Sequence, residues 1–289
     1  MALRLPGGSM LKRCVWVVAA TCALATSVWA DGPPIGVVDD PCAGVPVQPT
    51  DAHRASGDWY GNWMHDWLAA DFGQRCRYAA ENRALAPPSP DRVVFLGDSI
   101  TEGWKEALPA MFAGDVLDRG ISGQTTEQML VRFRADVADL HPAVVHVMAG
   151  TNDVAGNRGA TTVATIEGNI RSIVELARAN GIVVVLGSIP PASRFPWSPV
   201  RRSGDTIAAI NAWLRDYARR ERLIFVDYHA VLGDGRGGMR PEYSMDGVHP
   251  GRAGYEAMRP LALGAIRDAL ASRATPRAPR RGAGDRLPR

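Results

Sequence analysis

The chain has 289 residues, of which 46% are hydrophobic and 22% are charged, as in an ordinary globular domain with extensions. Its net charge of +3 comes from the two ends, because residues 31–271 hold 24 basic and 29 acidic residues and are net −5. This charge balance excludes a basic nucleic-acid-binding surface on the folded domain, and the composition excludes a collagen-like, coiled-coil or wholly disordered chain.

Residues 1–30 carry the pattern of a secretory signal peptide. Lys12 and Arg13 precede the apolar run Cys14–Leu24, and a small-residue cleavage site ends at Ala30. A membrane anchor is the alternative, but the apolar stretch is at the short limit for spanning a bilayer. We therefore expect cleavage after Ala30, export to the periplasm or the medium, and no stable insertion in the membrane.

Residues 31–90 predict an N-terminal extension of the folded domain. Within it, a helix is expected over Asp58–Leu85, where Trp59, Trp63 and Trp67 recur on one face and either pack against the domain or stack on sugar rings. Signal cleavage would leave two cysteines, Cys42 and Cys76. In an exported protein these form either one disulfide or two inert buried thiols.

Short apolar runs alternate with amphipathic stretches over residues 91–271, which we interpret as one domain. The expected strands are Val93–Leu96, Val116–Asp118, Val144–Met148, Ile182–Leu186 and Leu223–Val226. The expected helices are Thr101–Phe112, Thr126–Leu140, Thr161–Asn180, Asp205–Arg220 and Arg252–Ala271. Runs of Val, Ile and Leu separated by helices predict an α/β fold with a five-stranded parallel sheet that is buried on both faces. Residues 272–289, rich in Arg and Pro, are typical of a disordered tail.

A candidate site residue follows each of the first three strands. Ser99 ends the first strand and enters a helix, where it is either a nucleophile or a helix cap. Gly123 lies in the loop after the second strand, and Asn152 follows the third. Active sites of such sheets form at the carboxyl ends of the strands, so these groups are expected to meet there.

A histidine with a nearby acid follows the fifth strand. Asp246 and His249 are three positions apart on a turn, so the carboxylate can hold one ring nitrogen while the other accepts a serine proton. A metal half-site is the alternative, but no further ligands with metal-binding spacing accompany the pair. Together these residues are the set that acyl transfer needs, with Ser99 as nucleophile, His249 as base and Asp246 orienting His249. We expect neither a metal nor another cofactor.

The four blocks resemble those of the SGNH (GDSL-type) hydrolase family. They are Gly97-Asp98-Ser99, Ser122-Gly123, Gly150-Thr151-Asn152-Asp153 and Asp246-Gly247-Val248-His249. The resemblance implies a three-layer α/β/α sandwich of the flavodoxin-like type. It also implies an oxyanion hole formed by the backbone N–H groups of Ser99 and Gly123 and the side chain of Asn152. Gln124 stands where a small acidic residue is frequent in the family, and we expect an effect on substrate contacts.

One further motif, Gly233–Gly238, matches the dinucleotide-binding pattern G-x-G-x-x-G. It lies late in the chain, and no helix follows it directly. We interpret it as a flexible loop.

The predicted function is hydrolysis of carboxylic esters through an acyl-enzyme, with a small-molecule or glycan ester as partner. Trp104, Phe195 and Trp197 are expected to line the substrate pocket, which favours short-acyl esters such as O-acetylated carbohydrates. The alternatives are a lysophospholipase, thioesterase or arylesterase, and a non-catalytic carbohydrate-binding protein of the cell envelope. The sequence does not give the oligomeric state.

Overall fold

The structure is a computed structural model that describes residues 36–274. The chain divides into two compact units, Met1–Val45 and Pro46–Arg289. The helices that precede the first strand therefore belong to the same unit as the sheet. The predicted signal peptide lies outside the described residues, and so does the predicted tail from residue 275 onward.

The second unit contains one five-stranded parallel sheet with the order β2-β1-β3-β4-β5. The strands are β1 (Val93–Gly97), β2 (Val116–Gly120), β3 (Val144–Met148), β4 (Val183–Gly187) and β5 (Ile224–Val226). All five predicted strands are confirmed, and the fold class with them. The strand order reverses between β1 and β3, so the loops that leave these two strands diverge there. In sheets of this kind, ligands bind at such a point.

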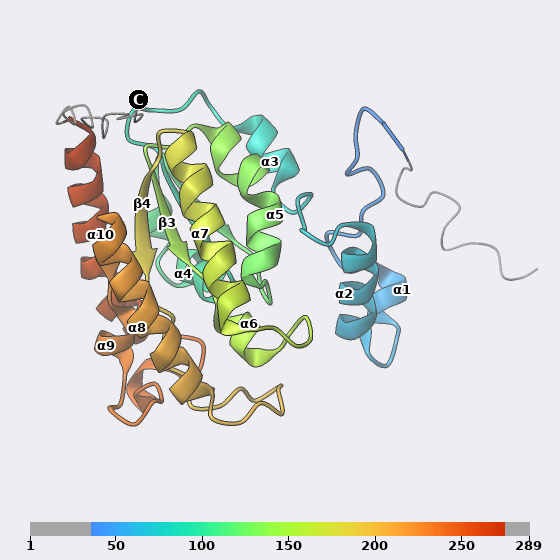
Figure 1. The fold of residues 1–289 in the computed structure, drawn as a ribbon. Helices are drawn as coiled ribbons and strands as arrows, with labels where there is room; N and C mark the ends of the chain where they lie inside the picture. Colours follow the sequence, from blue (N-terminus) through green and yellow to red (C-terminus); the bar gives the residue numbers. More distant parts are fainter. Residues whose placement is uncertain (1–35, 275–289) are drawn as a thin grey trace, which may run out of the picture. The chain divides into compact units, whose positions relative to one another are not determined.

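Helices cover both faces of the sheet, which gives the three layers (Figure 1). One core packs α5 (Thr126–Asp136), α7 (Val163–Ala179) and α8 (Ser203–Glu221) against strand residues such as Val94 and Val145. The other packs α4 (Ser99–Ala107), α9 (Tyr228–Leu232) and α10 (Arg252–Ala274) against residues such as Phe95 and Val144. Neighbours along a strand thus enter opposite cores, as the twofold period of a strand requires.

The remaining elements precede β1 or lie in the connections between the strands and helices already named. They are α1 (Asp51–Arg54), α2 (Trp59–Ala70), α3 (Ala79–Ala84), α6 (Thr151–Ala155) and three 3₁₀ turns, η1 (Pro109–Phe112), η2 (Ala138–Leu140) and η3 (Pro241–Tyr243). The helix α10 continues three residues beyond its predicted end at Ala271, so residues 272–274 are helical rather than part of a disordered tail. No helix within residues 36–274 combines the length and the apolar character that a membrane span requires.

The predicted single helix Asp58–Leu85 is wrong. The structure breaks it into α2 and α3, because Gln74 adopts a positive φ of 52° and Asp71 turns its carboxylate onto the backbone N–H of Cys76. Cys42 and Cys76 are both disulfide-bonded, so the alternative of two inert thiols is also wrong.

The tryptophan stripe of α2 packs along its own helix and is buried at one end. Trp67 is only 3% exposed, and the ring of Trp63 stacks on it with 5.3 Å between centroids. The indole N–H of Trp63 donates to the Pro46 carbonyl at 2.6 Å. Trp59 is 44% exposed and meets Tyr60 edge-on. Packing within the protein therefore explains the positions of the Trp63 and Trp67 rings, whereas the Trp59 ring stays largely exposed.

Gly120 ends β2 where the first turn of α4 crosses it. A Cβ at this position would lie 2.2 Å from the backbone nitrogen of Glu102 and 2.8 Å from the Asp98 carbonyl oxygen. We expect Gly120→Ala to lower the free energy of unfolding by about 3 kcal/mol, because backbone rather than a flexible side chain must move. Urea unfolding measures this, with Gly168→Ala in α7 as the control. No atom lies within 4 Å of a Cβ there, so the control should gain up to about 1 kcal/mol.

The carboxyl group of Asp118 in β2 makes stability depend on pH. Burial raises its pKa to about 7, although the Gly120 N–H donates to its Oδ1 at 2.6 Å, and among residues 36–274 its Oδ2 has no hydrogen-bond partner. The native state therefore binds a proton more tightly than the unfolded state. This contribution is fully present below the unfolded pKa of about 4 and is lost as pH rises to about 7, a change of about 4 kcal/mol.

Asp118→Asn removes this ionisation. We expect the free energy of unfolding of the wild type to fall more steeply between pH 5 and pH 8 than that of the variant. Denaturant titrations at the two pH values measure the difference. Equal pH dependence of the two proteins would show that Asp118 does not titrate in this range.

Candidate active site

Ser99, His249 and Asp246 form a continuous line of hydrogen bonds at the carboxyl edge of the sheet. Ser99 Oγ lies 2.9 Å from His249 Nε2, and His249 Nδ1 lies 2.7 Å from Asp246 Oδ2. Ser99 is the first residue of α4, and the Asp98 side chain caps this helix by accepting the Ile100 N–H at 2.9 Å. The structure thus brings together three residues that the sequence separates by 150 positions.

Local hydrogen bonds hold the acid of this line in place. Asp246 Oδ1 accepts the backbone N–H groups of Val248 at 2.9 Å and His249 at 2.8 Å, and the Ser244 hydroxyl at 3.1 Å. Burial alone would raise the pKa of Asp246, but the hydrogen bonds from the His249 side chain and from these amides lower it to about 2. Asp246 is therefore ionised at neutral pH and fixes the orientation of the His249 ring.

The three groups expected to form an oxyanion hole are linked through neighbouring residues, because the Asn152 side chain bonds Asp98, which precedes Ser99, and Gln124, which follows Gly123. Within the described part of the chain, no hydrogen bond occupies the backbone N–H of Ser99 or of Gly123, whose φ of 78° requires glycine. The Asn152 side chain is already engaged. Its Nδ2 donates to the Gln124 carbonyl at 3.0 Å and to Asp98 Oδ2 at 3.2 Å.

Asn157 is a residue that the sequence reasoning missed. Its Nδ2 donates to Asn152 Oδ1 at 2.7 Å, and its Oδ1 accepts the Trp197 indole N–H at 3.0 Å. The Trp197 ring lies beside the His249 ring, with 5.6 Å between centroids. We call Asn152, Asn157 and Trp197 the amide bridge, since it joins the proposed oxyanion donor to the ring over the proposed base. The signal in the sequence was weak: one more Asn in a loop after a strand.

Two predicted pocket residues do not reach the substrate. Trp104 has no exposed surface, because it packs between Phe95 and Tyr255 in the core, and Phe195 is 3% exposed. The prediction is wrong for both residues. Trp197 is 46% exposed and keeps its place beside the site. The expected effect of Gln124 on substrate contacts is also wrong, because its buried side chain bonds Gln74 and Arg132 instead.

The cleft beside Ser99 and His249 has a volume of about 530 Å³ and a wall of both polar and apolar groups. Glu102, which sequence reasoning also missed, is fixed in this wall. It accepts the backbone N–H and the hydroxyl of Ser122 and pairs with Arg77 at 3.2 Å. Across residues 36–274, no group of three or more His, Cys, Asp or Glu side chains is placed to hold a metal ion.

The family model of GDSL-like lipases and acylhydrolases matches residues 95–257, which is more than half of the chain. The chain belongs to this family. Membership makes it an ester hydrolase, in agreement with the serine, histidine and acid found together at the sheet edge.

Three similar proteins align over different shares of the chain. A GDSL-like lipase structure from Bacteroides thetaiotaomicron is 44% identical over 69% of this chain and all of that one, with a TM-score of 0.66. Esterase TesA of Pseudomonas aeruginosa is 30% identical over 55% of this chain and 75% of that protein. The uncharacterized lipoprotein YqeF of Bacillus subtilis is 32% identical, and the chain spans only 48% of its length.

Proposed function

We propose that this GDSL-like hydrolase cleaves short-acyl carboxylic esters, such as O-acetylated carbohydrates, through an acyl-enzyme on Ser99. The observation that carries the proposal is the line from Ser99 through His249 to the ionised Asp246, with two unoccupied amides beside the nucleophile. A base, an orienting acid and donors for a developing oxyanion are what acyl transfer needs.

In the first step, neutral His249 takes the Ser99 proton while the serine oxygen attacks the ester carbonyl carbon. The carbonyl oxygen becomes an oxyanion, which the Ser99 and Gly123 N–H groups and the Asn152 amide stabilise. As this intermediate collapses, the bond to the alkoxy group breaks and His249 gives its proton to the departing alcohol. Water, deprotonated by His249, then attacks the acyl carbon, and the acid leaves as Ser99 regains its proton.

The cleft wall supports a short acyl chain and a polar alcohol. Glu102, Glu106 and Arg252 line it beside Ser99, and the exposed ring of Trp197 offers a flat face for a sugar. A long acyl chain would need a continuous apolar surface, which charged groups interrupt here.

Hydrolysis of p-nitrophenyl acetate, butyrate and octanoate tests this proposal. We expect kcat/KM to fall from acetate to octanoate, together with labelling of Ser99 by a fluorophosphonate. A preference for octanoate would move the substrate to lipid-like esters or thioesters. Absence of both turnover and labelling would favour a non-catalytic binding protein.

We also propose that the enzyme is exported, with cleavage after Ala30. The signal-like pattern of residues 1–30, the disulfide-bonded state of Cys42 and Cys76 and the lipoprotein name of the YqeF relative support this location. Amino-terminal sequencing of the protein recovered from the periplasm or the medium should begin at Asp31. Recovery of the uncleaved chain from the cytoplasm would contradict the proposal.

A further inference from the structure

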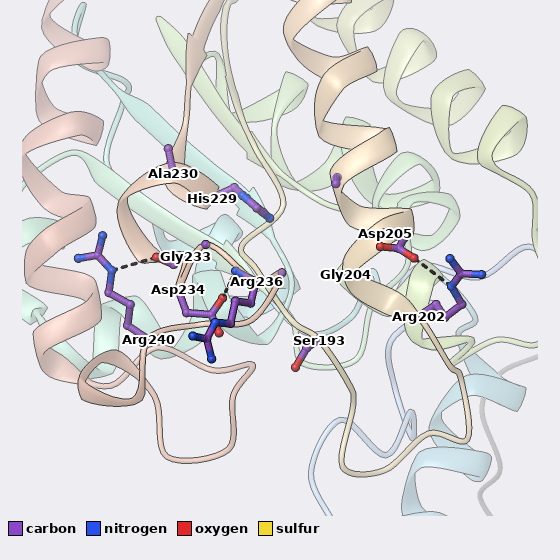
Figure 2. Close-up of a pocket in the computed structure, with 13 residues that line it drawn as sticks. Ser193, Arg202, Gly204, Asp205, His229, Ala230, Gly233, Asp234, Arg236 and Arg240 are labelled. Atoms are coloured by element: carbon purple, nitrogen blue, oxygen red, sulfur yellow. Dashed lines mark hydrogen bonds and ion pairs between the residues drawn. The ribbon is translucent and has the colours of Figure 1, made fainter.

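A second cavity, of about 820 Å³, opens where the segments that follow β4 and β5 meet (Figure 2). The first turn of α8 forms one wall, and the loop 233–240 forms the other. This loop contains the glycine-rich motif that sequence analysis left without a function. A Cβ on Gly204 would lie 3.0 Å from the Gly237 carbonyl oxygen, so the loop rests against the start of α8.

Three side chains of this cavity carry unused hydrogen-bonding capacity. Among the described residues, the Arg236 guanidinium makes no hydrogen bond or ion pair. Arg240 donates from its Nε to the Gly233 carbonyl at 2.9 Å, and its guanidinium lies over the Tyr243 ring, 5.7 Å from the ring centroid. The Nε2 of His229 is buried and has no partner within residues 36–274. In Figure 2 the Arg240 side chain turns toward the Gly233 carbonyl, on the side away from Arg236 and His229. All three residues line the same cavity.

The two acids of the cavity are already engaged. Asp205 pairs with Arg202 at 3.0 Å across the α8 terminus. Asp234 Oδ1 accepts the backbone N–H groups of Arg236 at 2.7 Å and Gly238 at 3.0 Å, so this carboxylate is used to hold the backbone of the loop. Three arginines against two acids leave an excess of positive charge, to which the amino-terminal end of the 19-residue helix α8 adds.

The cavity and the catalytic serine share one edge of the sheet. β5 lies three strands from β1, which separates the two places by about 14 Å at about 4.8 Å a strand. The loop 188–202 joins them, since Ser193 lines the cavity and Trp197 lies beside His249. An oligosaccharide of a few units can reach from one to the other.

We propose that this cavity binds the carboxylate of an acidic sugar residue in the same chain whose ester lies at Ser99. The enzyme would thus select O-acetylated oligouronides over neutral acetylated glycans. Guanidinium groups bind carboxylates through charge-assisted hydrogen bonds, often two at a time. Among the described residues, all the guanidinium nitrogens of Arg236 and the two Nη atoms of Arg240 make no hydrogen bond and can bind such a group. This inference rests on the proposed esterase function, whose substrate class it narrows.

The kinetic test compares the wild type with the double variant Arg236→Ala/Arg240→Ala on three substrates. For an O-acetylated oligouronide we expect KM to rise about 10-fold or more with kcat unchanged, since charge-assisted contacts to the ligand are lost. For an O-acetylated neutral oligosaccharide and for p-nitrophenyl acetate we expect no change. The control, Arg219→Ala/Arg220→Ala, removes the same charge from the opposite end of α8 and should behave like the wild type.

Equal KM changes on the acidic and neutral substrates, or none on the acidic one, would overturn the inference. Added NaCl should raise KM for the oligouronide alone in the wild type, because salt screens the charge contact. Calorimetric binding of a de-esterified oligouronide to Ser99→Ala separates this inference from the proposed function. Binding that is lost on adding the two arginine substitutions would support the cavity even without esterase activity, and absence of binding would reject it.

Discussion

Ser99→Ala is expected to lower kcat for p-nitrophenyl acetate by about 10⁴-fold or more. The serine oxygen is the atom that bonds the acyl carbon in the proposed mechanism, and His249 lies 2.9 Å away to take its proton. Without the hydroxyl, only binding and the oxyanion donors remain. Steady-state assays at saturating substrate, with the burst of p-nitrophenol followed in the wild type, measure the change.

Two controls test whether the loss of kcat comes from the missing hydroxyl rather than from unfolding. The melting temperature of Ser99→Ala should stay close to that of the wild type, because the lost hydroxyl lies at the surface end of a preformed helix. Ser172→Ala in α7 is the matched substitution away from the site and should keep full activity. If Ser99→Ala retained more than a few per cent of wild-type kcat, another group, such as the nearby Ser122, would have to be the nucleophile.

Asn152→Ala is expected to lower kcat by roughly 10²–10³-fold, the usual effect of removing one oxyanion donor. KM should change little, because the donor acts on charge that appears only in the transition state. An alternative role for Asn152 is purely structural, since its side chain also bonds Gln124 and Asp98. In that case melting temperature and KM would change together with kcat.

A further expectation concerns the amide bridge, and it depends on the role of Asn152. Asn157→Leu removes the donor that orients Asn152 Oδ1, so kcat should fall about 10-fold in the wild-type background. In the Asn152→Ala background the same substitution should have no further effect, because its target is gone. Asn62→Leu on α2 is the control, since its side chain bonds only the exposed Ser56 hydroxyl. Additive effects of the two substitutions would show that Asn157 does not act through Asn152.

The sequence predicted the sheet well because its strands are buried on both faces. Every residue of the run Val144–Met148 is buried, so its nearly continuous apolar sequence marks the strand. The glycines and polar residues that follow such runs mark the loops. Ser99, Gly123, Asn152 and His249 could be placed together for the same reason. The carboxyl ends of parallel strands necessarily share one edge.

Side-chain direction was harder to predict. Trp104 follows Ser99 closely in the chain, but on the helix it lies four residues after Ile100 and shares its buried face. Phe195 and Trp197 lie two positions apart in an irregular loop. Because such a loop has no regular repeat, the sequence does not indicate which of the two rings is buried. The bond between Trp197 and Asn157 joins two loops 40 positions apart, and only the packing of α6 and α8 brings them together.

The positions of Ser99 and His249 along the chain have a consequence for biosynthesis. Ser99 leaves the ribosome early, whereas His249 stands directly before α10, the last helix that the structure describes. The Tyr255 hydroxyl of α10 donates to the Ile100 carbonyl at 2.9 Å, which secures the C-terminal helix to the one that carries Ser99. A nascent or partly refolded chain is therefore expected to be inactive until the segment with His249 and α10 has packed against α4. Recovery of activity should lag behind recovery of helical circular dichroism during refolding.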